Sequence, residues 1–127
     1  MIKVLLVDDD AMEMKLFEAF LSRCTAVVDL YYCETVDEAI EKAREVEPDL
    51  IFLDDRLPPH MSCETSIPVL REAGVTTPIA VISAAIDQFN HRRYLDMGAT
   101  VAIDKCDINA DSIGPIIEAQ LETASAA

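Results

Sequence analysis

Residues 2–10 read IKVLLVDDD, a short apolar run that ends in three consecutive aspartates. Residues 50–55 read LIFLDD and repeat this arrangement, with Asp54 and Asp55 at the end. Apolar runs of this length are typical of buried β-strands. Two parallel strands that each end in carboxylates bring these groups to one edge of a sheet, where like charges repel. The two segments therefore predict both a sheet and a cation site at its edge.

The composition is that of an acidic globular domain. The chain has 127 residues, of which 51% are hydrophobic, and this suits a single domain, residues 1–127, with one core. The formal net charge is −14, from 24 acidic and 10 basic residues. This balance argues against DNA binding, because phosphate contacts need clustered lysine and arginine. It favours a cation or a basic partner surface.

We expect a cytoplasmic protein without a membrane segment. Lys3 is followed by only four apolar residues before the aspartates, so no signal peptide is expected, and no apolar run approaches membrane-spanning length. The cysteines are widely spaced and form no Cys-x-x-Cys pair, which favours reduced thiols over disulfides or a zinc site. They are Cys24, Cys33, Cys63 and Cys106.

Short apolar runs alternate with amphipathic stretches along the chain. The apolar runs predict strands over residues 2–7, 27–33, 50–54, 78–82 and 99–103. The amphipathic stretches predict helices over residues 11–23, 36–46, 65–74, 87–98 and 112–123, followed by a flexible tail, residues 124–127. Asp10 and Thr35 are each followed three residues later by glutamate, the spacing of a capping box. Residues 55–65 are predicted as a loop, and Pro68 is expected in the first turn of the third helix.

Five strands alternating with five helices predict an α/β fold with a parallel sheet covered on both faces. In doubly wound sheets, ligands bind outside the carboxyl ends of the strands, where the winding direction reverses. For the strand order 2-1-3-4-5, this point lies between the first and third strands. Asp8, Asp9 and Asp54 lie at the ends of those two strands.

The fourth and fifth predicted strands end nearby, in Ser83 and in Asp104-Lys105. Three carboxylates with one ammonium leave a charge of −2, which Mg²⁺ balances with the oxygen ligands that it prefers. A carboxylate beside a metal ion, a lysine and a hydroxyl suits the transfer of a phosphoryl group to Asp54.

The ordered motifs VDDD (residues 7–10), DDRLP (54–58), Ser83-Ala84, Gly98-Ala99 and Lys105 resemble the receiver domain of bacterial two-component response regulators, over about residues 2–123. The resemblance implies a flavodoxin-like, CheY-like fold. It implies that Asp54 accepts phosphate from a histidine kinase or histidine phosphotransferase and that the chain regulates a downstream protein partner. A monomer or weak dimer is expected.

The resemblance also assigns roles to individual residues. Asp9 and Asp54 would ligate Mg²⁺ together with the backbone carbonyl of Arg56, and Asp8 would act mostly through metal-bound water. Ser83 would hydrogen-bond to the phosphoryl group and Lys105 would pair with it. Ala84, next to Ser83, would leave room for the group.

Several positions depart from the family pattern. Cys106 follows the lysine where proline is usual, and Ala102 stands where the family has its switch aromatic. Residues 59–65 contain no glycine, which predicts a rearranged loop and a short third helix. Arg56, two positions past the acceptor, is expected to shield an aspartyl phosphate from water and so to slow its hydrolysis.

Two other functions stay open at this stage. One is a receiver-like interaction module that works without phosphorylation, which Ala102 and the missing proline favour. The other is a phosphatase of the haloacid-dehalogenase type, since residues 8–10 contain Asp-x-Asp, although Met12 does not fit that motif. We expect no enzyme activity beyond phosphorylation and dephosphorylation of the chain itself.

Some polar residues are expected to have no role in the site. Asp55 should point away from Asp54 by strand alternation and be solvated. Cys106 should be a partly buried, inert thiol. Residues 91–94, His-Arg-Arg-Tyr, form the only basic cluster and are expected to be either a partner patch or a solvated helix face.

Overall fold

A computed structural model shows five parallel strands in one sheet, in the order β2-β1-β3-β4-β5. The strands are β1 (Ile2–Val7), β2 (Val28–Cys33), β3 (Leu50–Asp54), β4 (Ile79–Ser83) and β5 (Val101–Asp104). The helices are α1 (Ala11–Leu21), α2 (Val36–Val46), α3 (Cys63–Glu72), α4 (Gln88–Asp96), the short 3-10 helix η1 (Lys105–Asp107) and α5 (Ile113–Ser125). The structure describes residues 1–25, 27–57, 62–84 and 86–125. The predicted fold class and strand order are confirmed.

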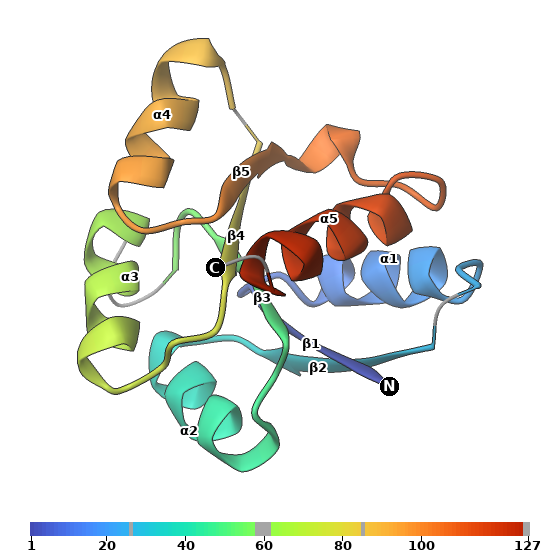
Figure 1. Cartoon of the computed structure of the whole chain (residues 1–127), viewed down its shortest axis with the longest axis horizontal. Coiled ribbons are helices and arrows are strands. Elements are labelled where there is room, and N and C mark those ends of the chain that lie inside the picture. The colour runs from blue at the N-terminus through green and yellow to red at the C-terminus, as the bar shows by residue number, and fades with distance from the viewer. Residues whose placement is uncertain (26, 58–61, 85, 126–127) are drawn as a thin grey trace.

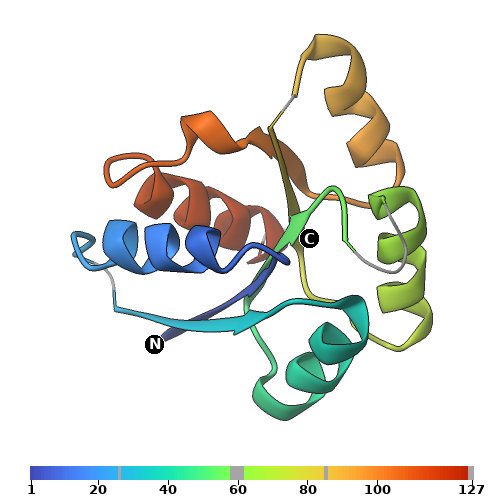
Figure 2. The same cartoon turned by 180° about the vertical axis from the view of Figure 1, so that it is seen from behind.

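The sheet is covered by helices on both faces. Helices α1 and α5 lie on one face, and α2, α3 and α4 lie on the other, as the front and back views show (Figures 1 and 2). Alternate residues of each strand enter the two cores: Leu5 and Val7 pack on the α2–α4 side, whereas Val4 and Leu6 pack on the α1–α5 side. All four side chains are fully buried, which explains why the strand sequence is a continuous apolar run rather than an alternating one.

The predicted helix caps are present, and the first departs from the expected pattern. Asp10 caps α1 by accepting a hydrogen bond from the Met12 N–H at 2.9 Å. The N–H of Asp10 itself donates to Asp8 Oδ1 at 2.9 Å, and this bond takes the place of the one to Glu13 that completes a capping box. The cap therefore also fixes the Asp8 carboxylate.

Several boundaries differ from the prediction by one or two residues, among them those of α3 and α5. Helix α3 begins at Cys63, which places Pro68 inside the helix instead of in its first turn. It begins early because Ser62 has the extended backbone of an N-cap residue. Helix α5 continues to Ser125, so the first two residues of the expected tail are helical, which the high helix propensity of Ala124 favours. Residues 126–127 of that tail and residues 58–61 of the predicted loop lie outside the described residues.

Candidate functional site

The carboxylates of two neighbouring strands meet at the carboxyl edge of the sheet. Strands β1 and β3 pair in parallel with Val7 opposite Leu53, so Asp8 and Asp54 follow at the same level. One carboxylate oxygen from each of Asp8, Asp9 and Asp54 lies within 4.8 Å of the other two. Asp8 is fully buried, whereas Asp9 is exposed. The predicted convergence of the three aspartates is therefore present.

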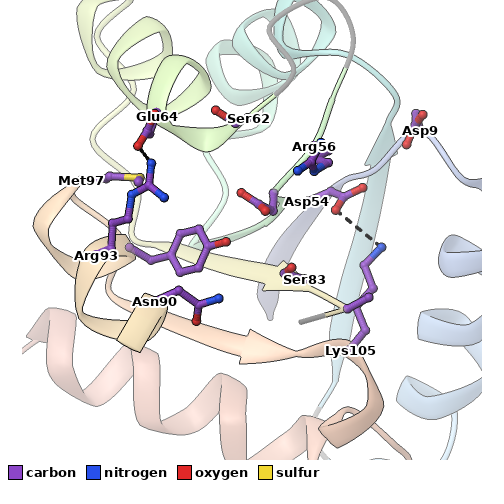
Figure 3. A pocket seen from close by; sticks show the side chains of 13 residues that line it. Asp9, Asp54, Arg56, Ser62, Glu64, Ser83, Asn90, Arg93, Met97 and Lys105 are labelled. Carbon is purple, nitrogen blue, oxygen red and sulfur yellow. Dashed lines mark ion pairs between the residues drawn. The ribbon is translucent and has the colours of Figure 1, made fainter. Parts of the chain in front are cut away.

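Lys105 follows β5, an edge strand of the sheet, and its side chain extends to this cluster. Its Nζ lies 3.1 Å from Asp8 Oδ2 and 3.5 Å from Asp54 Oδ1. Burial lowers the pKa of Lys105, but the attraction of Asp54 and Asp8 outweighs this, so the pKa is raised overall. The side chain is therefore an ammonium at neutral pH. Figure 3 shows this ion pair between Lys105 and Asp54, with Asp9 beyond the latter.

The Asp54 carboxyl is poised to ionise near neutrality. Burial and the neighbouring charge of Asp8 raise its pKa from 3.8 to about 7, against the opposing effects of Lys105 and of a hydrogen bond from the Arg56 backbone N–H. The cluster carries more negative charge than its lysine balances. Three carboxylates at one open edge are the kind of oxygen donors with which Mg²⁺ keeps several waters, so the residues present fit this ion.

Ser83 ends β4 beside these groups and is 9% exposed. It lines a cleft of about 720 Å³ together with Asp9, Asp54, Arg56 and Lys105. Exposed Ala84 lines the same cleft. The side chains of Asp9, Asp54, Ser83 and Lys105 thus lie around one opening (Figure 3). The Asp8 carboxylate, which is fully buried, lies within 4.8 Å of those of Asp9 and Asp54 but does not line the cleft.

The cleft extends further than the sequence indicated. It continues past Asp54 to the start of α3 and to α4, where Ser62, Glu64, Asn90, Arg93, Tyr94 and Met97 line it. An ion pair between Arg93 and Glu64 joins the two helices across this part (Figure 3). Tyr94 is only 7% exposed, so the expected surface patch over residues 91–94 is wrong for this residue. The helical spacing of Tyr94 with Met97 was a signal that both side chains face inward.

Asp55 lies outside the carboxylate cluster, as predicted, but it is not a solvated loop acid. It is half-buried, and its Oδ1 accepts a hydrogen bond from the buried Cys63 thiol at 3.2 Å. Burial and hydrogen bonding with Asp55 raise the pKa of Tyr94 to about 12, while hydrogen bonding with Ser83 opposes this shift. The expectation failed because α3 packs directly over Asp55, which makes it part of a polar network between the site and α4.

The turn after Lys105 also differs from expectation. Cys106 is exposed rather than partly buried, because η1 turns its side chain outward. Its backbone N–H donates to Asp104 Oδ1 at 3.0 Å. Ala102 is buried, at 6% exposed, in the same core cluster as Tyr94. A tyrosine of α4 therefore provides the aromatic ring near this strand, which has none at position 102.

The family of response regulator receiver domains has a sequence model that matches residues 4–114. The chain belongs to this family. Receiver domains of this kind act in two-component systems, where they interact with histidine kinases or phosphotransfer proteins and with downstream effectors. This membership does not support the phosphatase alternative.

Similar curated proteins are longer than this receiver domain. It is 31% identical over 113 residues to protein-glutamate methylesterase/protein-glutamine glutaminase 1 of Syntrophus aciditrophicus, which covers 87% of the chain and 32% of that protein. It is 32% identical over 97 residues to the alkaline phosphatase synthesis transcriptional regulatory protein PhoP of Bacillus subtilis, which covers 76% of the chain and 39% of that protein. The chain spans about a third of the length of these relatives, and the activities in their names belong to those whole proteins.

Solved receiver domains have the same fold. The BeF3-activated N-terminal receiver domain of Klebsiella pneumoniae RstA superimposes with a TM-score of 0.78 at 28% identity, covering 94% of this chain and 97% of that one. The receiver domain of the Francisella response regulator 1452 gives a TM-score of 0.80 at 20% identity, covering 98% of this chain and 99% of that one.

Across the described residues, the helices are too short or too polar to cross a membrane.

Proposed function

We propose that this receiver domain accepts a phosphoryl group on Asp54 from a phosphohistidine donor, in a reaction that needs Mg²⁺. The observation that carries the proposal is the position of the Asp54 carboxylate, which is grouped with Asp8 and Asp9 and lies 3.5 Å from the Lys105 ammonium. A carboxylate that shares its site with a cation pocket and an ammonium has the partners needed for phosphoryl transfer.

In this reaction an Asp54 carboxylate oxygen attacks phosphorus, and the bond between phosphorus and the donor imidazole nitrogen breaks. The products are an aspartyl phosphate and a free histidine. The Lys105 ammonium pairs with one phosphoryl oxygen and the Ser83 hydroxyl donates to another, while exposed Ala84 leaves space for the group. Asp9, Asp54 and the Arg56 carbonyl would hold Mg²⁺, with Asp8 acting through water. The ion supplies neutralising charge for the phosphoryl oxygens.

We further propose that phosphorylation regulates a protein partner through α4. The polar network of Ser83, Tyr94 and Asp55 connects the phosphoryl-binding edge with this helix. A Ser83 hydroxyl that turns to the phosphoryl group gives up its bond to Tyr94, which changes the side chains that α4 presents. Buried Ala102 favours the second candidate, an interaction module that works without phosphorylation, because no large side chain moves at that position.

One experiment separates the two candidates. The chain is incubated with acetyl phosphate and Mg²⁺, and its intact mass is followed. We expect the addition of one phosphoryl group, which EDTA and Asp54→Asn both abolish. Asp55→Asn is the matched control, because this neighbouring carboxylate lies outside the cluster. A wild-type chain that stays unmodified under these conditions supports the interaction module instead.

A further inference from the structure

Asp104 ends β5 directly before Lys105, and both of its carboxylate oxygens bind backbone N–H groups. Oδ1 accepts from Cys106 at 3.0 Å, and Oδ2 accepts from Ile86 at 3.4 Å. These donors belong to different segments, since Cys106 lies in the turn after β5 and Ile86 lies in the connection after β4. The Asp104 side chain therefore connects the segment that follows Ser83 with the turn that follows Asp104 itself.

The bond to Cys106 holds the turn in which Lys105 lies. Asp104 has an extended backbone, with φ −69° and ψ 133°, and is the N-cap of η1. The turn closes with a bond from the Ile108 N–H to the Lys105 carbonyl at 3.2 Å. The first N–H groups of a helical turn have no partner inside it, so a side-chain oxygen at the N-cap is what orders them. Proline at position 106 would have no N–H to offer, so this bond requires a residue other than proline there.

The bond to Ile86 fixes the same carboxylate from the other side. Asp104 pairs with Ser83 in the register of β4 and β5, so the two residues that precede the phosphoryl-binding loops already lie side by side. Ile86 packs against the core on the α2–α4 side, which anchors its backbone. The Asp104 carboxylate is thus held between a packed segment and the lysine turn.

The position of Lys105 depends closely on that turn. Its ammonium lies 3.1 Å from Asp8 and 3.5 Å from Asp54, although β3 and β4 separate β5 from β1 in the sheet. A long side chain that reaches over two strands carries any shift of its backbone to its tip. In a reacting site, a displacement of 1 Å can slow the reaction by about a hundredfold.

We propose that Asp104 is a positioning residue for phosphoryl transfer, acting through Lys105, in the place of the proline that the family usually has after the lysine. Asp104 is outside both the carboxylate cluster and the lining of the cleft, so it does not touch the reacting atoms. The proposal rests on the proposed function, and the test below separates the two.

The first readout is the initial rate of Asp54 phosphorylation by acetyl phosphate with Mg²⁺, measured by intact mass. We expect Asp104→Ala to be slower by about tenfold, and Asp104→Asn, which keeps an acceptor oxygen for Cys106, to stay within about threefold of the wild type. Asp107→Ala is the matched control, because it removes the same charge from the same turn without removing a side-chain hydrogen bond of the described residues. In a Lys105→Ala background, Asp104→Ala should change the rate by less than about twofold. A full tenfold loss there would show a general structural role and overturn the proposal.

The second readout needs no phosphorylation. A carbodiimide activates a carboxylate, the Lys105 amine attacks it, and an amide forms while the reagent takes up the lost water as a urea. Peptide mass spectrometry then measures the links from Lys105 to Asp8 and Asp54. We expect equal yields in the wild type, Asp104→Asn and Asp107→Ala, and a several-fold lower yield in Asp104→Ala.

Equal yields in all four proteins would overturn the proposal, and so would a lower yield without a lower rate. If the cross-linking yields are as expected but acetyl phosphate does not modify the wild-type chain, only the proposed function is overturned.

Discussion

The Lys105 ammonium lies 3.1 Å from Asp8 Oδ2, although the two residues are 97 positions apart in the chain. Asp8 follows β1 and Lys105 follows β5, and two other strands lie between these in the sheet. The buried Asp8 carboxylate needs a compensating charge, which Lys105 supplies. The contact therefore holds the two sides of the site together before any phosphoryl group arrives.

Binding of Mg²⁺ should stabilise the fold. At pH 8 we expect a saturating concentration, about 100 times the dissociation constant, to raise the free energy of unfolding by about 2.7 kcal/mol. The stabilisation should be smaller at pH 5, where Asp54 is protonated, because its pKa is about 7. Differential scanning calorimetry with Mg²⁺ and with EDTA measures both effects. Asp9→Asn should remove most of the stabilisation, and equal stabilisation of this variant would contradict the assigned ligand set.

The Asp54 carboxylate should make stability depend on pH in the absence of Mg²⁺. Its pKa rises from 3.8 to about 7 on folding, so between these values the folded chain keeps a proton that the unfolded chain releases. Stability contributed by this group is therefore lost as the pH rises toward 7. Asp54→Asn cannot ionise and should be more stable than the wild type at pH 8 by about 1–3 kcal/mol, with a smaller difference at pH 5.

Urea denaturation in EDTA at the two pH values measures this difference. Asp107→Asn, an exposed acid of η1, is the control and should show none of this pH dependence. The same Asp54→Asn advantage at both pH values would rule out ionisation of Asp54 as its cause.

Arg56 should prolong the life of the aspartyl phosphate. Its exposed side chain lines the cleft beside Asp54, and from there we expect it to restrict the approach of water to phosphorus. We expect Arg56→Asn to speed the loss of phosphate by about three- to tenfold, because an open site hydrolyses reactive intermediates faster. Intact mass after removal of the donor follows the decay. Arg92→Asn, at an exposed arginine of α4, should leave the rate unchanged, and an unchanged rate in Arg56→Asn would reject the shielding role.

Helix α1 should contact the protein that donates the phosphate. Met12 is 60% exposed and Leu16 43%, and both follow closely after the aspartates of β1. A protein that approaches Asp54 from this edge buries the two side chains. We expect Met12→Ser and Leu16→Ser each to slow transfer from a phosphorylated histidine phosphotransferase by about tenfold, equivalent to about 1.4 kcal/mol.

The same two variants should keep the wild-type rate with acetyl phosphate, which needs no docking surface. Val27→Ser is the matched control: this residue is 64% exposed, but it precedes β2 at the opposite edge of the sheet. Equal losses with the protein donor and with acetyl phosphate would indicate damage to the site instead of a docking surface.

Local pattern was sufficient to predict the strands and helices, whereas the strand order 2-1-3-4-5 came from known doubly wound sheets. Each strand is a run of apolar residues buried on both faces, and each helix has a repeating apolar side, so the order of elements follows from burial alone. Parallel strands align their carboxyl ends, which is why Asp8, Asp9, Asp54, Ser83 and Lys105 could be grouped without coordinates.

The surroundings of the site could not be predicted in this way. The sequence places Asp55 beside a catalytic candidate and Tyr94 in a basic cluster. In the structure Tyr94 is buried and Asp55 is half-buried, and both belong to a network with Cys63. The contacts between these side chains depend on how α3 and α4 pack against the sheet, and no local sequence pattern predicts that packing.

The sequence by itself thus determined the five strands, the five helices and the charged edge. The spacing of apolar residues indicates which segments are buried, and the acidic residues mark the carboxyl ends of the strands. Only the tertiary structure decided that Asp104 ties Cys106 to Ile86 and that Tyr94 faces the core. These contacts join residues of different elements, and the distance between such residues depends on how whole helices and strands pack. The sequence of either segment alone therefore does not predict the contact.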